Sequence, residues 1–254
     1  MTTFVAVHGA FFGGWSWKPV AVLMEAQGHT FFRPTLTGCA EREHVGSPQV
    51  NLTTHVRDIV SLLELEELDD IVLVGHSYAG AVITAVAQQA HQRIRGMVYL
   101  DALMPQDGER PRDSFPAAVY DRGEALAAEQ GDGWKVPCFL PMDKFCSSSD
   151  PVRPWLTAQL RGMPLGAFSQ RLHLPVDTTH LPLLFVYCKA NALGMFELAR
   201  DRAASRPNAQ VVELNTQHAA MLTQPEAVAD LLCKFASGVP SRRSQQDKVQ
   251  VAAR

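Results

Sequence analysis

Short apolar runs alternate with segments of helical periodicity along most of the chain, and this alternation limits the possible folds more than any other feature. The apolar runs lie at residues 3–8, 30–33, 70–74, 96–100, 183–188 and 210–214. Apolar residues at helical spacing separate most of them, at residues 17–27, 53–63, 79–89 and 195–204, and a last helical segment follows at 225–235. Continuous apolar runs between helices are typical of strands buried on both faces of a parallel sheet. The sequence therefore predicts an α/β fold with about six mostly parallel strands flanked by helices.

The alternation is lost between residues 105 and 182. Ten of the sixteen prolines fall there, together with several large aromatic side chains, namely Trp134, Phe139, Phe145, Trp155 and Phe168. Proline breaks long helices, and an insertion of this kind can form an apolar cover over a site. We therefore expect a single domain over residues 1–240 with a lid insertion at about 105–182. Residues 241–254 are polar without periodicity and are expected to form a disordered tail.

The composition excludes several classes of function. The chain of 254 residues has 23 basic and 26 acidic side chains, a net charge of -3, and no basic run across its body. Binding of nucleic acid or of an anionic membrane needs a positive field, so neither partner is expected. No apolar stretch approaches the ~20 residues of a spanning helix, and no signal-peptide pattern is present, so we expect a cytoplasmic protein. The five cysteines are scattered without metal-ligand spacing, which predicts reduced thiols and no metal site.

The sharpest chemical signal follows the third apolar run. There the sequence Gly75-His76-Ser77-Tyr78-Ala79-Gly80 joins a predicted buried strand to an alanine-rich helix. A serine at such a turn is exposed and strained, and the residues two before and two after it must be small, as Gly75 and Ala79 are. This context predicts that Ser77 is a nucleophile. The helix N-terminus also directs backbone N–H groups toward the site, and the amide of Tyr78 is the expected first donor to an oxyanion.

A serine hydroxyl needs a base, and His218 follows the last predicted strand after a short loop. The other eight histidines are expected to be solvated or locally hydrogen-bonded rings. The second oxyanion donor is expected in the glycine-rich loop at residues 8–15, where we assign the amide of Ala10. No phosphate-binding glycine motif is present in that loop.

Five ordered motifs resemble the α/β-hydrolase superfamily: VHGAFFGGWSW, TLTGCAEREH, VGHSYAG, VYLDALMP and QHAAMLTQPE. They are most similar to the compact branch that contains hydroxynitrile lyases, plant methyl-salicylate-type esterases and bacterial carboxylesterases. The resemblance implies an α/β-hydrolase fold, a Ser-His-Asp triad, an oxyanion hole from Ala10 and Tyr78, no cofactor, and a mostly apolar pocket under the lid.

Two positions depart from the plant members that the chain resembles. Their acid position is occupied here by Asn191, and Asp101, at the end of the strand after the nucleophile helix, is the alternative. We expect Asp101 to orient His218, and Asn191 remains a possible neutral orienter. Cyanohydrin-cleaving members carry a lysine directly after the histidine, where this chain has Ala219. Ester hydrolysis is therefore favoured over lyase chemistry.

The predicted function is a carboxylesterase-like serine hydrolase that cleaves a small or medium apolar ester through an acyl-enzyme. The alternatives are a cofactor-free lyase or C–C hydrolase on the same scaffold, and a non-catalytic small-molecule receptor, which Asn191 at the usual acid position keeps open. The expected partner is a small-molecule ester, and the oligomeric state stays open, a homodimer included. Four aromatic residues are predicted to line the substrate pocket: Phe11, Trp134, Phe139 and Trp155.

Overall fold

The computed structural model describes residues 1–190 and 194–241. Within these residues one parallel sheet of six strands has the order β2-β1-β3-β4-β7-β8. The strands are β1 (Thr3–Val7), β2 (Thr30–Phe32), β3 (Ile71–His76), β4 (Ile94–Leu100), β7 (Leu183–Cys188) and β8 (Ala209–Leu214). The predicted α/β fold with six parallel strands is confirmed, although β3 and β4 are each longer than their apolar runs.

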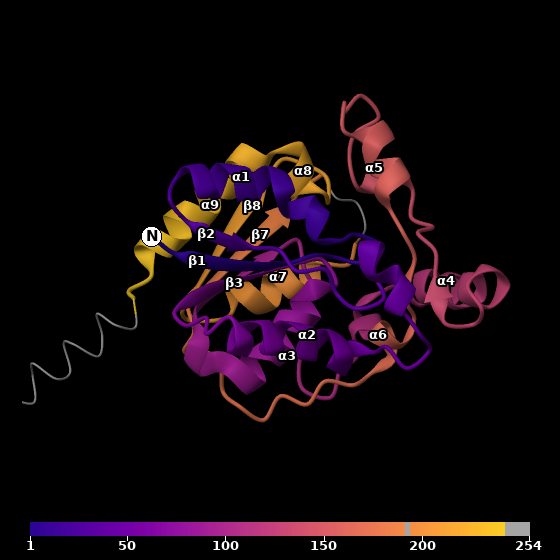
Figure 1. Ribbon diagram of the computed structural model, residues 1–254, viewed down its shortest axis with the longest axis horizontal. Helices are drawn as coiled ribbons and strands as arrows, with labels where there is room; N and C mark the ends of the chain where they lie inside the picture. Colours follow the sequence, from indigo (N-terminus) through magenta and orange to yellow (C-terminus); the bar gives the residue numbers. More distant parts are fainter. Residues whose placement is uncertain (191–193, 242–254) are drawn as a thin grey trace, which may run out of the picture.

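Helices cover both faces of this sheet (Figure 1). One face is covered by α1 (Lys18–Ala26), α8 (Ala220–Thr223) and α9 (Pro225–Gly238), and the other by α2 (Leu52–Leu65) and α3 (Ala79–Ala90). The helix α7 (Glu197–Ala204) joins β7 to β8. Short 3₁₀ helices lie at Gly14–Trp17, Ala40–Val45 and His91–Arg93.

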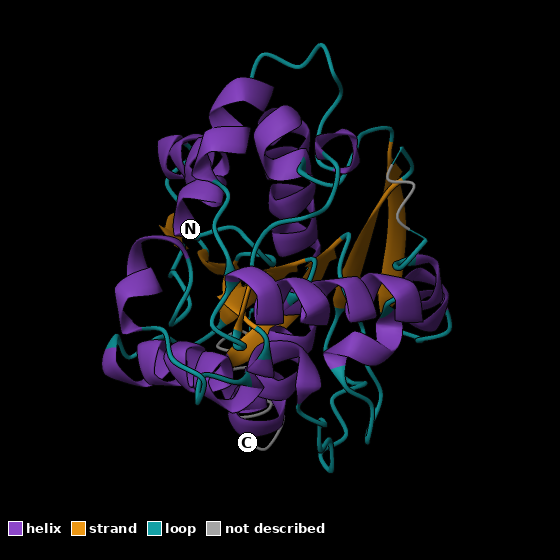
Figure 2. Cartoon of the chain, turned by 90° about the vertical axis from the view of Figure 1, so that its right-hand side faces the viewer, coloured by secondary structure: helices purple, strands orange, loops and turns teal. Residues whose placement is uncertain are grey.

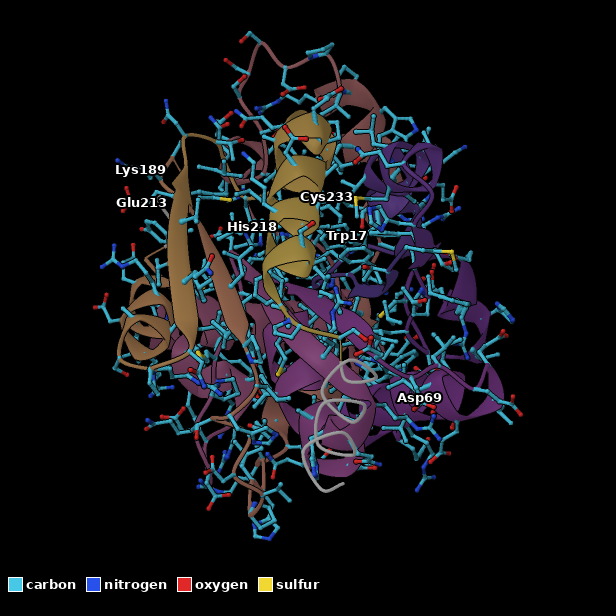
Figure 3. All side chains as sticks on the ribbon, turned by 90° about the vertical axis from the view of Figure 1, so that its left-hand side faces the viewer. Trp17, Asp69, Lys189, Glu213, His218 and Cys233 are labelled. Carbon is cyan, nitrogen blue, oxygen red and sulfur yellow. The ribbon has the colours of Figure 1, made fainter. Side chains whose placement is uncertain are left out.

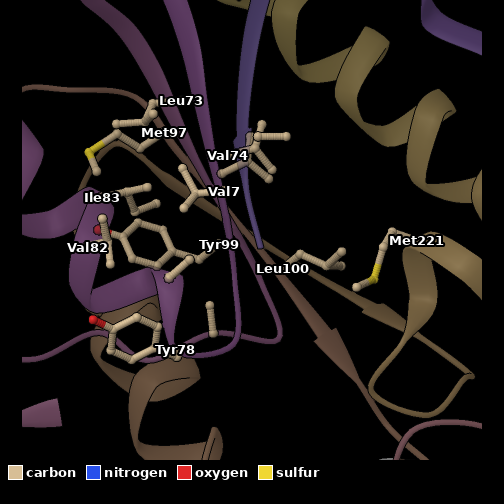
Figure 4. Packing of buried hydrophobic residues seen from close by; sticks show 14 of the residues in the cluster. Val7, Leu73, Val74, Tyr78, Val82, Ile83, Met97, Tyr99, Leu100 and Met221 are labelled. Carbon is tan, nitrogen blue, oxygen red and sulfur yellow. The ribbon is translucent and has the colours of Figure 1, made fainter. Parts of the chain in front are cut away.

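The two central strands are buried along their whole length. Every residue of β3 and of β4 is buried, because helices cover the strands on both sides. Neighbouring residues of β4 point to opposite faces: Tyr99 packs toward α3, and Leu100 points toward Met221 on the other side (Figure 4). Because both faces are buried, the strands have nearly continuous apolar sequences instead of alternating apolar and polar residues.

The start of α2 differs from the prediction. The predicted helical segment begins at residue 53 with two threonines, and threonine is a common capping residue, but the cap is Asn51 and the helix begins at Leu52. The side chain of Asn51 accepts a hydrogen bond from the Thr54 amide (3.2 Å), and the Thr54 hydroxyl accepts one from the Asn51 amide (3.3 Å). This reciprocal pair fixes the first turn of the helix, so Thr54 completes the cap from inside the helix.

Residues 105–182, which we call the cover segment, lie between β4 and β7. They contain α4 (Ala117–Gln130), α5 (Arg153–Gln159) and α6 (Gly166–Ser169), the two-stranded antiparallel pair β5 (Lys135–Val136) and β6 (Met163–Pro164), and 3₁₀ helices at Pro111–Ser114 and Met142–Lys144. The helices α4, α5 and α6 lie beyond the carboxyl ends of the strands (Figure 1), and Figure 2 shows that side of the molecule facing the viewer. The exact limits of the domain and of the insertion stay predictions, and residues 242–254 of the expected tail lie outside the described residues.

The strand β8 is one edge of the sheet, and its side chains are partly exposed. Lys189 and Glu213 form an ion pair of 3.0 Å where β7 and β8 end (Figure 3). Charged side chains on an edge strand discourage pairing with another chain. Among the helices that the structure describes, none is both long and apolar enough to cross a membrane.

Candidate active site

Ser77 occupies a tight turn between β3 and α3. Its φ is +56°, a left-handed conformation that costs energy for a residue with a Cβ. The turn closes so tightly that a Cβ on Gly75 would lie 2.9 Å from the carbonyl oxygen of Ala79, and a Cβ on Gly80 would lie 1.9 Å from that of Leu103. Contact with the backbone therefore leaves no room for a larger side chain at Gly75 or Gly80.

Asp101 and His218 lie in direct contact. The Nδ1 atom of His218 donates a hydrogen bond of 2.7 Å to Oδ2 of Asp101, and both side chains are almost completely buried. The other carboxylate oxygen of Asp101 accepts from the amide of Cys188 (3.2 Å), and the amide of Asp101 donates to the carbonyl of Val186 (2.7 Å). The neighbouring strand β7 thus holds the carboxylate in place. The carboxylate in turn selects the tautomer of His218 in which Nδ1 carries the hydrogen and Nε2 is unprotonated.

The main chain of His218 is also held on two sides. The His218 amide donates to the carbonyl of Lys144 in the cover segment (3.1 Å), and the next amide, of Ala219, donates to the carbonyl of Phe145 (2.9 Å). The carbonyl of His218 accepts from Nε2 of His76 (3.0 Å). The sequence did not predict these contacts. Bonds to backbone carbonyls do not depend on residue type, and His76 was expected to be solvated or hydrogen-bonded only to residues nearby in the chain.

Ser77 and His218 line the same cavity. Its walls are mostly aromatic and aliphatic, and no described lining residue carries a formal charge at neutral pH. Seven of the described lining residues have aromatic six-membered rings: Phe11, Tyr78, Phe115, Tyr120, Phe139, Phe145 and Phe168. Such a cavity accepts an uncharged, apolar molecule next to the serine.

The two predicted oxyanion donors lie at the same cavity. Ala10 and Tyr78 are both lining residues. Among the described residues, the backbone hydrogen bonds of turns and loops include none that is donated by the amide of Ala10 or of Tyr78. The two residues thus lie at the cavity, and no described backbone acceptor in a turn or loop occupies either amide.

The aromatic pocket residues expected from the sequence divide into two pairs. Phe11 and Phe139 line the cavity and contact each other at 6.4 Å between ring centroids. Trp134 and Trp155 are not among the lining residues. Trp155 packs edge-on against Trp15 at 5.2 Å and is 45% exposed, and the Trp134 indole lies against Gly46. Lid aromatics are large enough to form contacts outside the pocket, so residue type alone does not place them.

Burial changes the proton affinity of the histidines near the site. It lowers the pKa of His218 below the ordinary value of 6.5, because the charged ring would lose its hydration. The ring is therefore neutral at pH 7 and can accept a proton, and the carboxylate of Asp101 would compensate the charge so gained. His8, His55 and His76 are fully buried as well, and burial lowers the pKa of each. The expectation that these three are solvated or locally bonded rings is wrong for all of them, since each ring is buried and has a partner distant in sequence.

No group of three or more side chains that could hold a metal ion occurs among residues 1–190 and 194–241. Asn191, the alternative orienter of the histidine, lies outside the described residues. The five cysteines, which include the buried Cys39, Cys146 and Cys188, are free thiols.

A parallel α/β sheet with a strained serine after its third strand, and a buried histidine–aspartate pair at the same cavity, defines the α/β-hydrolase class of proteins. The chain belongs to the Alpha/beta hydrolase family, whose model matches residues 4–231.

Individual relatives agree with this assignment. A carbendazim hydrolyzing esterase of Nocardioides sp. (strain SG-4G) is 32% identical over 91% of this chain and 98% of its own length. A pyrethroid hydrolase of Sphingobium wenxiniae is 23% identical over 98% of this chain and 92% of its own. The solved structure of an extracellular α/β-hydrolase from a Paenibacillus species has a TM-score of 0.81 at 24% identity, covering 92% of this chain and 99% of that one, which shows the shared fold. The relatives named as esterases and hydrolases thus match nearly the whole chain.

Proposed function

We propose that this protein is a serine hydrolase that cleaves small or medium apolar carboxylic esters through an acyl-enzyme. The observation that carries the proposal is the shared apolar cavity of Ser77 and His218, with the carboxylate of Asp101 at 2.7 Å from the far side of the imidazole.

The reaction would proceed in two halves. His218 takes the proton of the Ser77 hydroxyl through Nε2 as Oγ adds to the ester carbonyl carbon, and the carbonyl oxygen becomes an oxyanion bound by the amides of Ala10 and Tyr78. Collapse of this intermediate breaks the bond to the alcohol oxygen, which receives the proton from His218. Water, activated by the same histidine, then attacks the acyl-enzyme and releases the acid. Asp101 holds the imidazole and stabilises it while it carries the proton.

The apolar walls support the substrate class. An ester with uncharged aryl or alkyl groups loses little on entering this cavity, whereas a charged group would lose its hydration without a partner. Carbendazim and a pyrethroid belong in the first substrate panel because relatives are named for hydrolysing them.

The proposal can be tested by labelling the native protein with a fluorophosphonate and mapping the modified peptide. We expect the label on Ser77, turnover of p-nitrophenyl esters with a burst of nitrophenol, and loss of both in Ser77→Ala. A label elsewhere, or ester turnover that survives in Ser77→Ala, would overturn the proposal. Release of cyanide from a cyanohydrin without ester turnover would support a lyase instead, and tight ligand binding by native and Ser77→Ala protein without any burst would support a receptor.

A further inference from the structure

The segment at residues 35–37, the start of the TLTGCAEREH motif, has no part in the chemistry proposed above. It nevertheless contacts two buried histidines that lie next to the two oxyanion donors. His8 is the first residue of the loop that contains Ala10, and His55 lies on α2 next to Tyr78. We call residues 35–37 the brace.

His55 connects the brace to Tyr78. Its Nε2 lies 2.9 Å from the carbonyl oxygen of Thr37, which can only accept, so Nε2 carries the hydrogen. In the neutral ring Nδ1 is then an acceptor, and the hydroxyl of Tyr78, 2.9 Å away, donates to it. Burial lowers the pKa of His55 and raises that of Tyr78, so both groups stay neutral and keep these roles.

His8 makes the corresponding connection to the other donor loop. Its Nδ1 lies 2.9 Å from the carbonyl oxygen of Gly9 and therefore carries the hydrogen. Its Nε2 accepts a hydrogen bond of 3.0 Å from the amide of Leu36. The hydroxyl of Thr35 also accepts from the amide of Gly14 (2.8 Å), which joins the brace to the same loop again.

The brace itself is fixed from outside. Asp58 accepts from both the amide (2.7 Å) and the hydroxyl (2.8 Å) of Thr37. Arg42 donates to the carbonyl of Thr35 (2.8 Å) and to the hydroxyl of Thr37 (3.0 Å). Charged side chains hold both ends of the brace. The Leu36 amide and the Thr37 carbonyl, which bond to His8 and His55, are therefore held in fixed positions.

We propose that His8 and His55 are positioning residues that align the amides of Ala10 and Tyr78 with a common oxyanion, by tying the loop of each donor to the same three-residue brace. This inference rests on the proposed esterase function, because only an oxyanion formed at Ser77 would use the alignment. Neither histidine ring lines the cavity, so their effect on substrate passes through the donors.

The experiment compares variants that cut each connection with variants that restore it. His55→Leu and Tyr78→Phe remove the bond between the ring and the phenol, whereas His55→Asn can return an amide oxygen close to the position of Nδ1. His8→Leu removes the acceptor for Leu36, whereas His8→Gln can return an oxygen near the position of Nε2. Tyr99→Phe is the matched control, because its buried hydroxyl bonds to Thr84 (2.8 Å) away from the cavity.

The readouts are kcat, KM, and the affinities for an aryl-alkyl trifluoromethyl ketone and for the corresponding methyl ketone. The trifluoromethyl ketone adds to Oγ of Ser77, whose proton passes to His218, and its carbonyl π bond becomes an oxyanion, whereas the methyl ketone binds without a stable adduct. Loss of one donor costs about 100- to 1000-fold in kcat in other hydrolases, so misalignment is expected to cost about 10- to 100-fold. We expect this loss in kcat and in trifluoromethyl ketone affinity, with KM and methyl ketone affinity nearly unchanged, and partial recovery in His55→Asn and His8→Gln.

Other outcomes overturn the inference. Folded His55→Leu, His8→Leu and Tyr78→Phe proteins with native kcat and native trifluoromethyl ketone affinity would contradict it. Parallel losses for both ketones would show that the connections only shape the pocket. If His55→Leu does not fold, Tyr78→Phe decides for that connection, because it removes one hydroxyl and keeps the ring; if His8→Leu does not fold, native kcat and native trifluoromethyl ketone affinity in Tyr78→Phe still contradict the inference. A native protein without ester turnover or Ser77 labelling would refute the proposed function and this inference with it, whereas an active native protein with unaffected variants refutes the inference alone.

Discussion

The Nδ1 atom of His218 lies 2.7 Å from Oδ2 of Asp101, although 117 positions separate the two residues in the chain. Asp101 directly follows β4, and His218 follows β8, with β7 between these strands in the sheet. The carboxyl ends of parallel strands meet at one edge of the sheet, and this topology brings the pair together.

Replacing Asp101 by Asn is expected to lower kcat for a p-nitrophenyl ester by about 10⁴-fold, because an amide can stabilise the wrong tautomer of the histidine and carries no charge. Thermal unfolding should show that the variant is folded. Asp177→Asn serves as the matched control, since that carboxylate is exposed and, among the described residues, accepts its hydrogen bonds from Thr179, two positions along the chain. A loss of less than tenfold would mean that Asp101 is not the orienting acid.

Gly80→Ala is expected to reduce the free energy of unfolding by about 1–3 kcal/mol. The new Cβ would lie 1.9 Å from the carbonyl oxygen of Leu103, so the backbone would have to move. Gly238→Ala in α9 is the control, since its methyl group would meet no described heavy atom within 4 Å and alanine favours the helix. Urea denaturation of both variants measures the difference. Equal stabilities would show that the turn after Ser77 has room that the structure does not show.

A negatively charged ester should be a poor substrate. Comparison of methyl phenylacetate with monomethyl succinate is expected to show a kcat/KM at least about 100-fold lower for the charged ester, because an unpaired carboxylate would be desolvated among aromatic walls. Product formation can be followed by pH-stat titration for both. Comparable values for the two esters would argue that substrate does not enter this cavity.

Stability should fall as the pH decreases from 6.5 toward about 4. Burial lowers the pKa of His8 from 6.5 to about 4, so between these values the unfolded chain binds a proton that the folded chain does not. The contribution is complete above pH 6.5 and is lost progressively below it, by about 3 kcal/mol for a shift of this size. Urea denaturation at pH 7.5, 6, 5 and 4 tests the slope. A free energy of unfolding that stays constant over this range would contradict the buried, neutral state of His8.

Much of the fold could be predicted from the sequence because burial on two faces leaves a continuous apolar run. Strand β7, for example, coincides with its run at residues 183–188. The turn at Ser77 could also be recognised, since its steric demands act on neighbouring residue types. The cap of α2 at Asn51 was missed because the threonine pair at residues 53 and 54 gives the same capping signal.

Only part of the candidate site could be predicted from the sequence. The sequence places reactive or ionisable side chains just after predicted strands, at Ser77, Asp101 and His218. The structure brings Asp101 into contact with His218 and places Ser77 and His218 at one cavity. The positions of Trp134 and Trp155 could not be predicted, because an aromatic side chain fits equally well inside or outside a pocket. The partners of His55 depend on the tertiary arrangement of α2 and the brace, which one sequence does not reveal.

The carbonyls of Lys144 and Phe145 hold the amides of His218 and Ala219, so the cover segment is also part of the support for the proposed base. An engineer who exchanges residues 105–182 for the corresponding insertion of another hydrolase, in order to graft a new specificity, would replace that support together with the pocket walls. Chimeras that retain the turn at Met142–Lys144 and the following Phe145 should therefore keep their turnover rate while the specificity changes, and chimeras without this turn should lose rate for every ester alike.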